Sequence, residues 1–327
     1  LLRRVMAEDD PEEIRMWLSA TLTRLGSGQT DEALLRWPES FELMDAVLEN
    51  YKTIANAPPE LRRDLTWPWH SWNKIIDPPE EGMLALITAP DGQGKTIYGE
   101  SIAEHWAQRK NRVVFVHYEL NRKLMLLRRT SRHTGISARD LRSGNLNELQ
   151  LHKYQESRAR LLSWEGYISY LHSPGWTMEQ TIAELNKMNN EDECDVVVLD
   201  YLEKVSPSNR QIKLFGTNTY QREADNVEQL KNFAEKTGIP VVMIAQMSKA
   251  GKQSSFENVD RTGIRGAGEK SDKANLVVLL RRDRIEDGYS NVVDVLVDKN
   301  TMGGTGTFKQ MMQPEYFRVG DIQLGVM

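Results

Sequence analysis

The chain has 327 residues, of which 39% are hydrophobic and 27% charged. This is typical of a globular protein with a sizeable core, and no apolar run is long enough to span a membrane. Its 42 basic and 47 acidic residues give a net charge of −5, so any binding of nucleic acid would need local basic loops.

The chain contains a single cysteine, Cys194. One cysteine excludes an internal disulfide and a thiolate metal cluster, and it favours a reducing compartment. No signal peptide is visible, so we expect a cytoplasmic location and no membrane partner. Because the chain starts at Leu1 rather than at a methionine, we expect the natural N-terminus to lie upstream.

Residues 1–64 are expected to form a helical N-terminal region, followed by an α/β domain over residues 65–327. The stretch "PEEIRMWLSATLTRL" has helical spacing and Pro11 at a suitable first-turn position. A second amphipathic helix is predicted over 38–55, before the Pro58-Pro59 breaker. The Trp-rich stretch 66–72 favours core packing over the alternative, a base-stacking platform.

From about residue 80 the pattern alternates between strands and helices. The strand candidates are residues 83–88, 112–119, 167–172, 195–200, 239–246, 275–281 and 291–299. The helix candidates are residues 95–109, 121–133, 147–163, 177–190 and 220–236. Continuous apolar strands between helices predict a mostly parallel sheet covered on both faces, and the last two strands are expected to be an antiparallel addition.

The stretch "TAPDGQGKT" lies between a predicted strand and a predicted helix, which is the context of a phosphate-binding P-loop. The first position of the G-x-x-x-x-G-K-T pattern is Ala89, which is tolerable if this residue still belongs to the strand. Loop N–H groups would surround the phosphates, Lys95 would neutralise phosphate oxygens, and Thr96 would hold Mg²⁺. The predicted nucleotide-binding residues are Asp91, Gly92, Gln93, Gly94, Lys95 and Thr96. The alternative is a Gly-rich turn that contains Lys-Thr by chance.

Three further polar residues end predicted strands. Asp200 follows "VVVL" and could support the metal; alone, it would be read as a turn or cap residue. Glu119 could activate water, or it could only interact with a helix dipole. Gln246 could sense the γ-phosphate, although alone it is a weak signal. His117 and Tyr118 are interpreted as structural.

These motifs, in this order, resemble the RecA-like ATPase domain of the DnaB replicative helicase family and, more loosely, phage and mitochondrial primase-helicases. The resemblance covers Leu65 to Arg318. It extends to "IRGAGEKSDKANLVVLLRRD" and to "VDKNTMGGTGTFKQMMQPEYFRV", which resembles the family's C-terminal hairpin. It implies a RecA-like fold, ATP and Mg²⁺ as cofactors, and a catalytic role for Glu119, Lys95 and Gln246.

The resemblance also implies a homo-oligomeric ring, expected to be a hexamer, in which a neighbouring subunit completes each site. Lys299 falls on the first basic finger position, but Thr301 stands where the family has an arginine. A trans arginine typically contributes about 10³-fold or more to phosphoryl transfer. Three explanations are open: Lys299 alone stabilises the transferred phosphoryl group, another arginine (Arg281, Arg282 or Arg284) reaches the site, or turnover is slow. Lys299 could also be an ordinary surface lysine. The predicted helix 38–55 would be the family's linker helix, which docks onto the adjacent protomer, or a helix packed on its own domain.

Single-stranded DNA is the expected partner, with a loader or a primase as a further one. The resemblance assigns DNA contacts to Lys249, Arg265, Gly266 and Gly268. Other basic candidates lie in the loops 203–219 and 247–270: Lys204, Arg210, Lys213, Lys252, Arg261 and Lys270. Such residues would contact phosphates without sequence preference.

The function that these features favour is a ring-forming helicase motor that moves along single-stranded DNA in replication. It would work in the cytoplasm, or in the host cytoplasm if the chain is phage-encoded. The alternative is a RecA-superfamily ATPase without unwinding activity, such as a recombination mediator, a loader or a KaiC-like regulator. A scaffold without turnover is disfavoured, because Lys95, Glu119 and Asp200 are all present.

Overall fold

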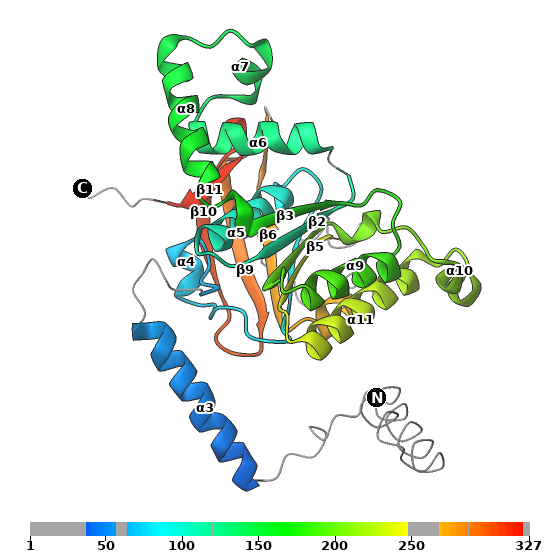
Figure 1. The fold of residues 1–327 in the computed structure, drawn as a ribbon. Coiled ribbons are helices and arrows are strands. Elements are labelled where there is room, and N and C mark those ends of the chain that lie inside the picture. Colours follow the sequence, from blue (N-terminus) through cyan, green and yellow to red (C-terminus); the bar gives the residue numbers. More distant parts are fainter. Residues whose placement is uncertain (1–36, 57–63, 120, 248–267, 287, 323–327) are drawn as a thin grey trace, which may run out of the picture. The chain divides into compact units, whose positions relative to one another are not determined.

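The computed structural model describes residues 37–56, 64–119, 121–247, 268–286 and 288–322 (Figure 1). The chain divides into two compact units, Leu1–Pro58 and Pro59–Met327, a few residues before the division expected after residue 64. In the first unit the described element is helix α3 (Trp37–Asn56), over the range predicted as a helix. The helix expected near Pro11 lies outside the described residues.

The second unit is built on a nine-stranded sheet with the order β11-β10-β9-β6-β1-β5-β4-β2-β3. All pairs from β6 to β3 are parallel, which confirms the mostly parallel sheet. The strands are β1 (Leu84–Ala89), β2 (Val113–His117), β3 (Ile168–His172), β4 (Val196–Asp200), β5 (Val241–Gln246), β6 (Leu276–Arg281), β9 (Val292–Asn300), β10 (Gly306–Gln313) and β11 (Arg318–Asp321). A small hairpin, β7 (Arg284–Ile285) and β8 (Gly288–Tyr289), connects β6 to β9.

Helices cover both faces of this sheet (Figure 1). Helix α5 (Lys95–Gln108) packs its apolar side chains into one hydrophobic cluster, and helices α9 (Met178–Asn190) and α11 (Thr219–Thr237) pack into the cluster on the other face. The central strands β1, β2 and β4 are buried along their whole length, as strands covered on both faces must be. The remaining helices are α4 (His70–Asn73), α6 (Arg122–Thr134), α7 (Ala138–Ser143), α8 (Glu148–Leu162), α10 (Asn209–Phe215) and α12 (Gly268–Lys273). Among the described helices, none has the length and apolar character needed to cross a membrane.

The antiparallel part of the sheet differs from the expectation. β6 pairs with β1 in parallel, so it belongs to the core sheet, and the antiparallel addition begins only at β9. The burial patterns explain the difference: the first five residues of β6 are all buried, whereas buried and partly exposed residues alternate along β9. The sequence pattern did not predict the short strand β11, which pairs with β10.

The Trp-rich stretch lies in the core, which confirms its packing role. Trp67 and Trp72 are at most 1% exposed, and their ring centroids lie 5.2 Å apart. The Trp72 indole N–H donates to Gln310 Oε1 at 3.1 Å, so this segment joins the C-terminal strands to α5, whose Tyr98 hydroxyl donates to the same oxygen at 2.9 Å.

Removal of the Trp72 side chain should therefore destabilise the second unit strongly. We expect Trp72→Ala to lower the free energy of unfolding by about 3–5 kcal/mol, because it leaves a cavity in a close-packed core. Trp72→Phe keeps most of the ring and should cost less. Met302→Ala, at a side chain 48% exposed, serves as a control and should stay within about 0.5 kcal/mol of the unsubstituted chain. Urea unfolding would measure all three, and a Trp72→Ala loss no larger than that of the control would contradict the packing role.

Candidate nucleotide-binding site

The predicted nucleotide-site residues lie at or just beyond the ends of four strands that are neighbours in the sheet, in the order β1, β5, β4 and β2. Ala89 at the end of β1 is in register with Gln246 at the end of β5. Asp200 at the end of β4 is in register with His117, two residues before Glu119. Because these strands are parallel, their carboxyl ends meet at one edge of the sheet, where ligands bind in open α/β folds.

The phosphate loop joins β1 to α5 at this edge. Ala89 is the last residue of β1 and is fully buried. It therefore still belongs to the strand, which was the condition for an alanine at the first position of the motif. Gly92 and Gly94 have φ angles of 73° and 89°, a region that favours glycine. A Cβ atom at Gly94 would also collide with the side chain of Met312. Backbone geometry therefore favours glycine at positions 92 and 94 of the loop.

Side chains hold the loop from both flanks. The Lys95 ammonium donates to the carbonyl oxygens of Ala89 and Pro90, at 2.8 and 3.0 Å. The Gln246 side-chain amide donates to Asp91. Gln93 is only 4% exposed, and its Oε1 accepts a hydrogen bond of 2.5 Å from the Arg282 backbone N–H. The side chain of Gln93 thus anchors the loop to the end of β6, and the residue would contact phosphate through its backbone.

Asp200 and Thr96 form the part of the site that fits a metal ion. Asp200 is 4% exposed and is hydrogen-bonded to Thr96. Burial raises the pKa of Asp200 to about 7, although the Thr96 hydrogen bond acts in the opposite direction. Asp200 Oδ1 is buried without a hydrogen-bond partner among the described residues. A hydroxyl beside a buried carboxylate oxygen of this kind suits Mg²⁺, directly or through a bound water.

Glu119 lies beyond the end of β2, which stops at His117 rather than at residue 119 as expected. Its carboxylate is 51% exposed and lies 3.4 Å from the Lys204 ammonium. An exposed carboxylate at this edge can reach a water molecule, as a general base requires. The neighbouring residues are structural: His117 is buried and its ring stacks on His172, and the Tyr118 hydroxyl is 2.8 Å from that of Thr181.

Two of the basic finger candidates, Lys299 and Arg282, lie in different places. Lys299 pairs with Val277 near the start of β6, toward the edge of the sheet opposite the phosphate loop, and donates to the Ser271 and Asp272 carbonyl oxygens at 3.2 and 2.8 Å. Arg282 is 8% exposed, and its guanidinium donates to the Ser290 and Tyr289 carbonyl oxygens. Arg282 therefore supports its own phosphate loop. Lys299 lies away from its own phosphate loop.

Most predicted DNA contacts fall outside the described residues: Lys249, Lys252, Arg261, Arg265 and Gly266. Gly268 is the first residue of α12. The inclusion of Lys270 among the phosphate-contacting candidates is wrong for this structure, because its ammonium is buried between Glu203 and Glu223.

The other basic candidates are placed differently. Arg210 forms ion pairs with Glu179 and Asp225, and Lys204 pairs with Glu119. Lys213 is exposed on α10.

Sequence reasoning missed several residues that contact the site. Tyr289 and Met312 border the two loop glycines, and Glu203 Oε1 accepts from the Gln246 backbone N–H at 2.9 Å. These contacts join segments far apart in the chain, so the local pattern carried no signal for them.

The phosphate loop, the buried aspartate and the mostly parallel sheet define the class of RecA-like P-loop domains. Residues 69–321 match the model of the DnaB-like helicase C terminal domain, and the chain belongs to that family, as the resemblance implied.

The chain is 24% identical over 237 residues to the replicative DNA helicase DnaC of Bacillus subtilis, covering 71% of this chain and 51% of the relative. It is 24% identical over 224 residues to a probable plasmid replicative DNA helicase of Chlamydia trachomatis, covering 68% and 47%. The chain spans about half the length of the curated relatives it matches.

Solved structures share the fold. One of them, described as an ATPase domain, aligns with a TM-score of 0.71 and 17% identity over 86% of this chain and 99% of that one. A DnaB-like replicative helicase, studied for its interactions with primase, aligns with a TM-score of 0.70 and 17% identity over 85% of this chain and 66% of that one. These alignments confirm the predicted RecA-like fold.

We expect Glu119→Gln to bind ATP nearly normally but to lose hydrolysis by about 10²–10⁴-fold, because it removes the expected general base and keeps the shape of the side chain. Lys95→Ala should instead weaken nucleotide binding itself. Fluorescent-nucleotide titration and a phosphate-release assay would separate the two effects. Glu235→Gln, at an exposed carboxylate on α11 next to Gly82 at the opposite edge of the sheet, is a control for charge removal. Hydrolysis by Glu119→Gln at the rate of this control would remove Glu119 from the mechanism.

Proposed function

We propose that this chain is the ATP-hydrolysing motor of a ring-forming DNA helicase that moves along single-stranded DNA in replication. The observation that carries the proposal is the convergence of the phosphate loop, Asp200, Glu119 and Gln246 on one edge of a DnaB-like domain. The names of the curated relatives, which are replicative DNA helicases, support the same activity.

Each residue at this edge has a chemical role in the proposal. Mg²⁺-bound ATP supplies the phosphoanhydride bond that is broken. Lys95 would exchange its loop carbonyl contacts for phosphate oxygens, and Thr96 and Asp200 would hold the metal. Glu119 would orient and deprotonate the attacking water. Gln246 would respond to the presence of nucleotide in the site through its hydrogen bond to Asp91.

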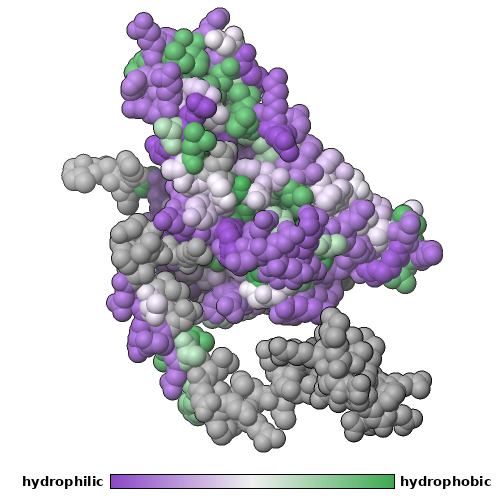
Figure 2. Space-filling model, in the orientation of Figure 1, coloured by the Kyte–Doolittle hydropathy of each residue, from purple (hydrophilic) through white to green (hydrophobic). Residues whose placement is uncertain are grey.

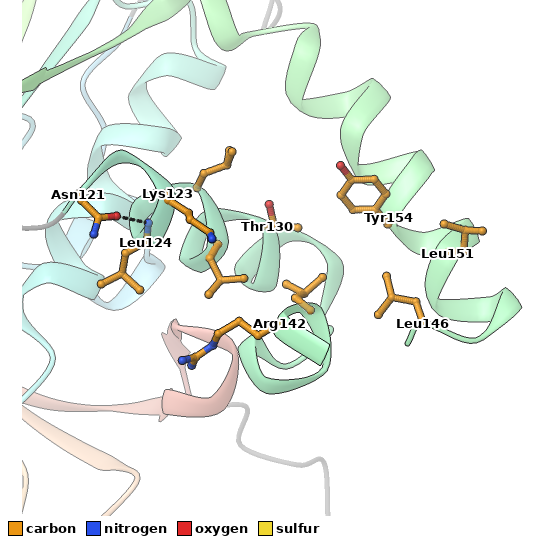
Figure 3. A pocket seen from close by; sticks show the side chains of 11 residues that line it. Asn121, Lys123, Leu124, Thr130, Arg142, Leu146, Leu151 and Tyr154 are labelled. Atoms are coloured by element: carbon orange, nitrogen blue, oxygen red, sulfur yellow. Dashed lines mark hydrogen bonds between the residues drawn. The ribbon is translucent and has the colours of Figure 1, made fainter. Parts of the chain in front are cut away.

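A groove in the second unit supports self-association. It has a volume of about 680 Å³ and lies among helices α6, α7 and α8 (Figure 3). Its lining is largely apolar and includes Leu124, Leu126, Leu151 and Tyr154, each at least 36% exposed. Apolar surface over these helices is visible at the top of Figure 2. Exposed apolar surface of this kind marks an interaction site.

Helix α3 presents a matching surface. Phe41, Met44, Leu48 and Tyr51 follow one another at helical spacing and are 67, 49, 44 and 48% exposed. We propose that α3 of one copy packs into the α6–α8 groove of the next, as expected of a linker helix, and that the copies close into a hexameric ring. Lys299 of one subunit would then serve the nucleotide site of its neighbour.

The DNA-binding part of the proposal rests on the family and on the basic segment around Lys249 and Arg265. In the ring, such segments would line a channel and contact successive phosphates. A loader or a primase would be a further partner. A replicative helicase motor would act where DNA is replicated, in the cytoplasm of a cell or of a phage host. Thr301 at the second finger position is the observation that keeps the alternative open, an ATPase that binds DNA or protein without unwinding.

Single-stranded DNA should stimulate ATP hydrolysis, and its binding should weaken steeply as the salt concentration rises. The double variant Lys249→Ala/Arg265→Ala should lose the stimulation and flatten the salt dependence by about one unit per lost phosphate contact. Hydrolysis without DNA should persist. The measurement is the ATPase rate against DNA concentration at several salt concentrations.

Lys309→Ala, at a lysine 66% exposed on β10, is the control for loss of a surface charge and should keep both properties. If the unsubstituted chain hydrolyses ATP as an assembled ring but neither binds DNA nor responds to it, the motor proposal fails. The regulator or loader alternative would then replace it.

Assembly should depend on the α6–α8 groove. Leu151→Glu places a charge in the groove lining and should abolish rings, because a carboxylate would be desolvated on docking. Leu149→Glu changes the same residue type on the same helix outside the lining, where the side chain is 64% exposed, and should leave rings intact. Native mass spectrometry with an ATP analogue and Mg²⁺ would distinguish them. Equal assembly of both variants would show that the groove is not the interface.

A further inference from the structure

Lys270 is a buried lysine in the first turn of α12. Its side chain is 3% exposed, and its ammonium lies 2.6 Å from Glu203 Oε1 and 2.7 Å from Glu223 Oε2. A buried ammonium is costly unless it is paired, and the two carboxylates supply that pairing. Lys270 is thereby fixed just after the basic segment that contains Lys249 and Arg265.

Glu203 also holds the other end of that segment. The same Oε1 atom accepts a hydrogen bond of 2.9 Å from the backbone N–H of Gln246, the last residue of β5. A single carboxylate oxygen therefore accepts from Gln246, directly before the loop 247–270, and from Lys270, the last residue of that loop. Glu203 is itself largely buried, with 16% of its side chain exposed, and burial raises its pKa.

The turn that carries Glu203 contacts both sides of the nucleotide site. This turn, η4 (Leu202–Lys204), begins two residues after Asp200. On one side, Glu203 holds Gln246, whose amide donates to Asp91 of the phosphate loop. On the other side, Lys204 lies 3.4 Å from the Glu119 carboxylate. The turn thus connects α12 to the two side chains proposed to sense the nucleotide and to activate water.

We propose that the Glu203–Lys270 ion pair couples the basic segment to ATP hydrolysis. The proposal rests on the proposed function, in which that segment binds DNA. Because one oxygen accepts both hydrogen bonds, a displacement of Lys270 moves Glu203 and, with it, the β5 end at Gln246. Lys270 and Glu203 are positioning residues: Glu203 accepts from Gln246 and Lys270, and both residues act through Gln246 and Lys204.

The test compares two variants that each leave Lys270 with one carboxylate. Glu203→Leu breaks the connection to Gln246, whereas Glu223→Leu removes the other partner of the same lysine and keeps that connection. In the 327-residue chain, both variants should lower the melting temperature to a similar extent. Glu203→Leu should reduce the fold-stimulation of the ATPase by single-stranded DNA about fivefold or more, the lower limit of typical coupling between sites. Glu223→Leu should retain the stimulation, and the KM for ATP should stay unchanged in both variants.

Lys270→Met, which keeps the apolar stem and removes the charge, provides a second measurement and should reproduce the Glu203→Leu result. Equal stimulation in Glu203→Leu and Glu223→Leu, whether retained or lost in both, would overturn the coupling role. So would full stimulation of Lys270→Met. A wild-type chain that hydrolyses ATP without any response to DNA would overturn the proposed function itself, and that outcome is visible before any variant is made.

Discussion

Parallel pairing of β1, β5, β4 and β2 is the constraint on which the site depends. The four strands run in one direction, so the loops that follow them all emerge at one edge of the sheet. Residues separated by more than 150 positions, such as Asp91 and Gln246, come into hydrogen-bond contact there. The pairing in turn requires both faces of the sheet to be covered, and the two hydrophobic clusters against α5 and against α9 and α11 meet that requirement.

A buried charge network fixes the two helices that flank the site. Glu100 and Glu104 on α5 are both 3% exposed and pair with Arg132 on α6, and Glu104 also accepts a 2.7 Å hydrogen bond from His133. Burial raises the pKa of Glu100, and the guanidinium groups oppose that effect. Helix α5 begins at Lys95, and α6 begins shortly after Glu119. The network therefore joins the helix that begins at Lys95, the lysine proposed to bind phosphate, to the helix that follows the proposed base.

Each of the two units also carries exposed apolar side chains. Association of neighbouring copies would explain three features. These are the exposed apolar residues of α3, the α6–α8 groove, and the position of Lys299 far from its own phosphate loop. A site completed by a neighbour makes hydrolysis depend on assembly. The proposed coupling through the Glu203–Lys270 ion pair between η4 and α12 would make the rate of hydrolysis respond to DNA as well, so that turnover would be fastest in a ring loaded on its substrate.

The sequence alone determined the class of fold and supplied the candidate residues of the site, because both are encoded locally. Continuous apolar strands between helices indicated the parallel sheet, and the strand–loop–helix context identified the P-loop despite Ala89. Strand-end positions singled out Glu119, Asp200 and Gln246. The tertiary structure decided what depends on distant partners. It placed β6 in the parallel core and buried Lys270 between two glutamates, and it set Lys204 against Glu119. A charged residue has the same appearance in a sequence whether it faces water or a buried carboxylate, and only the packing of remote segments decides between the two.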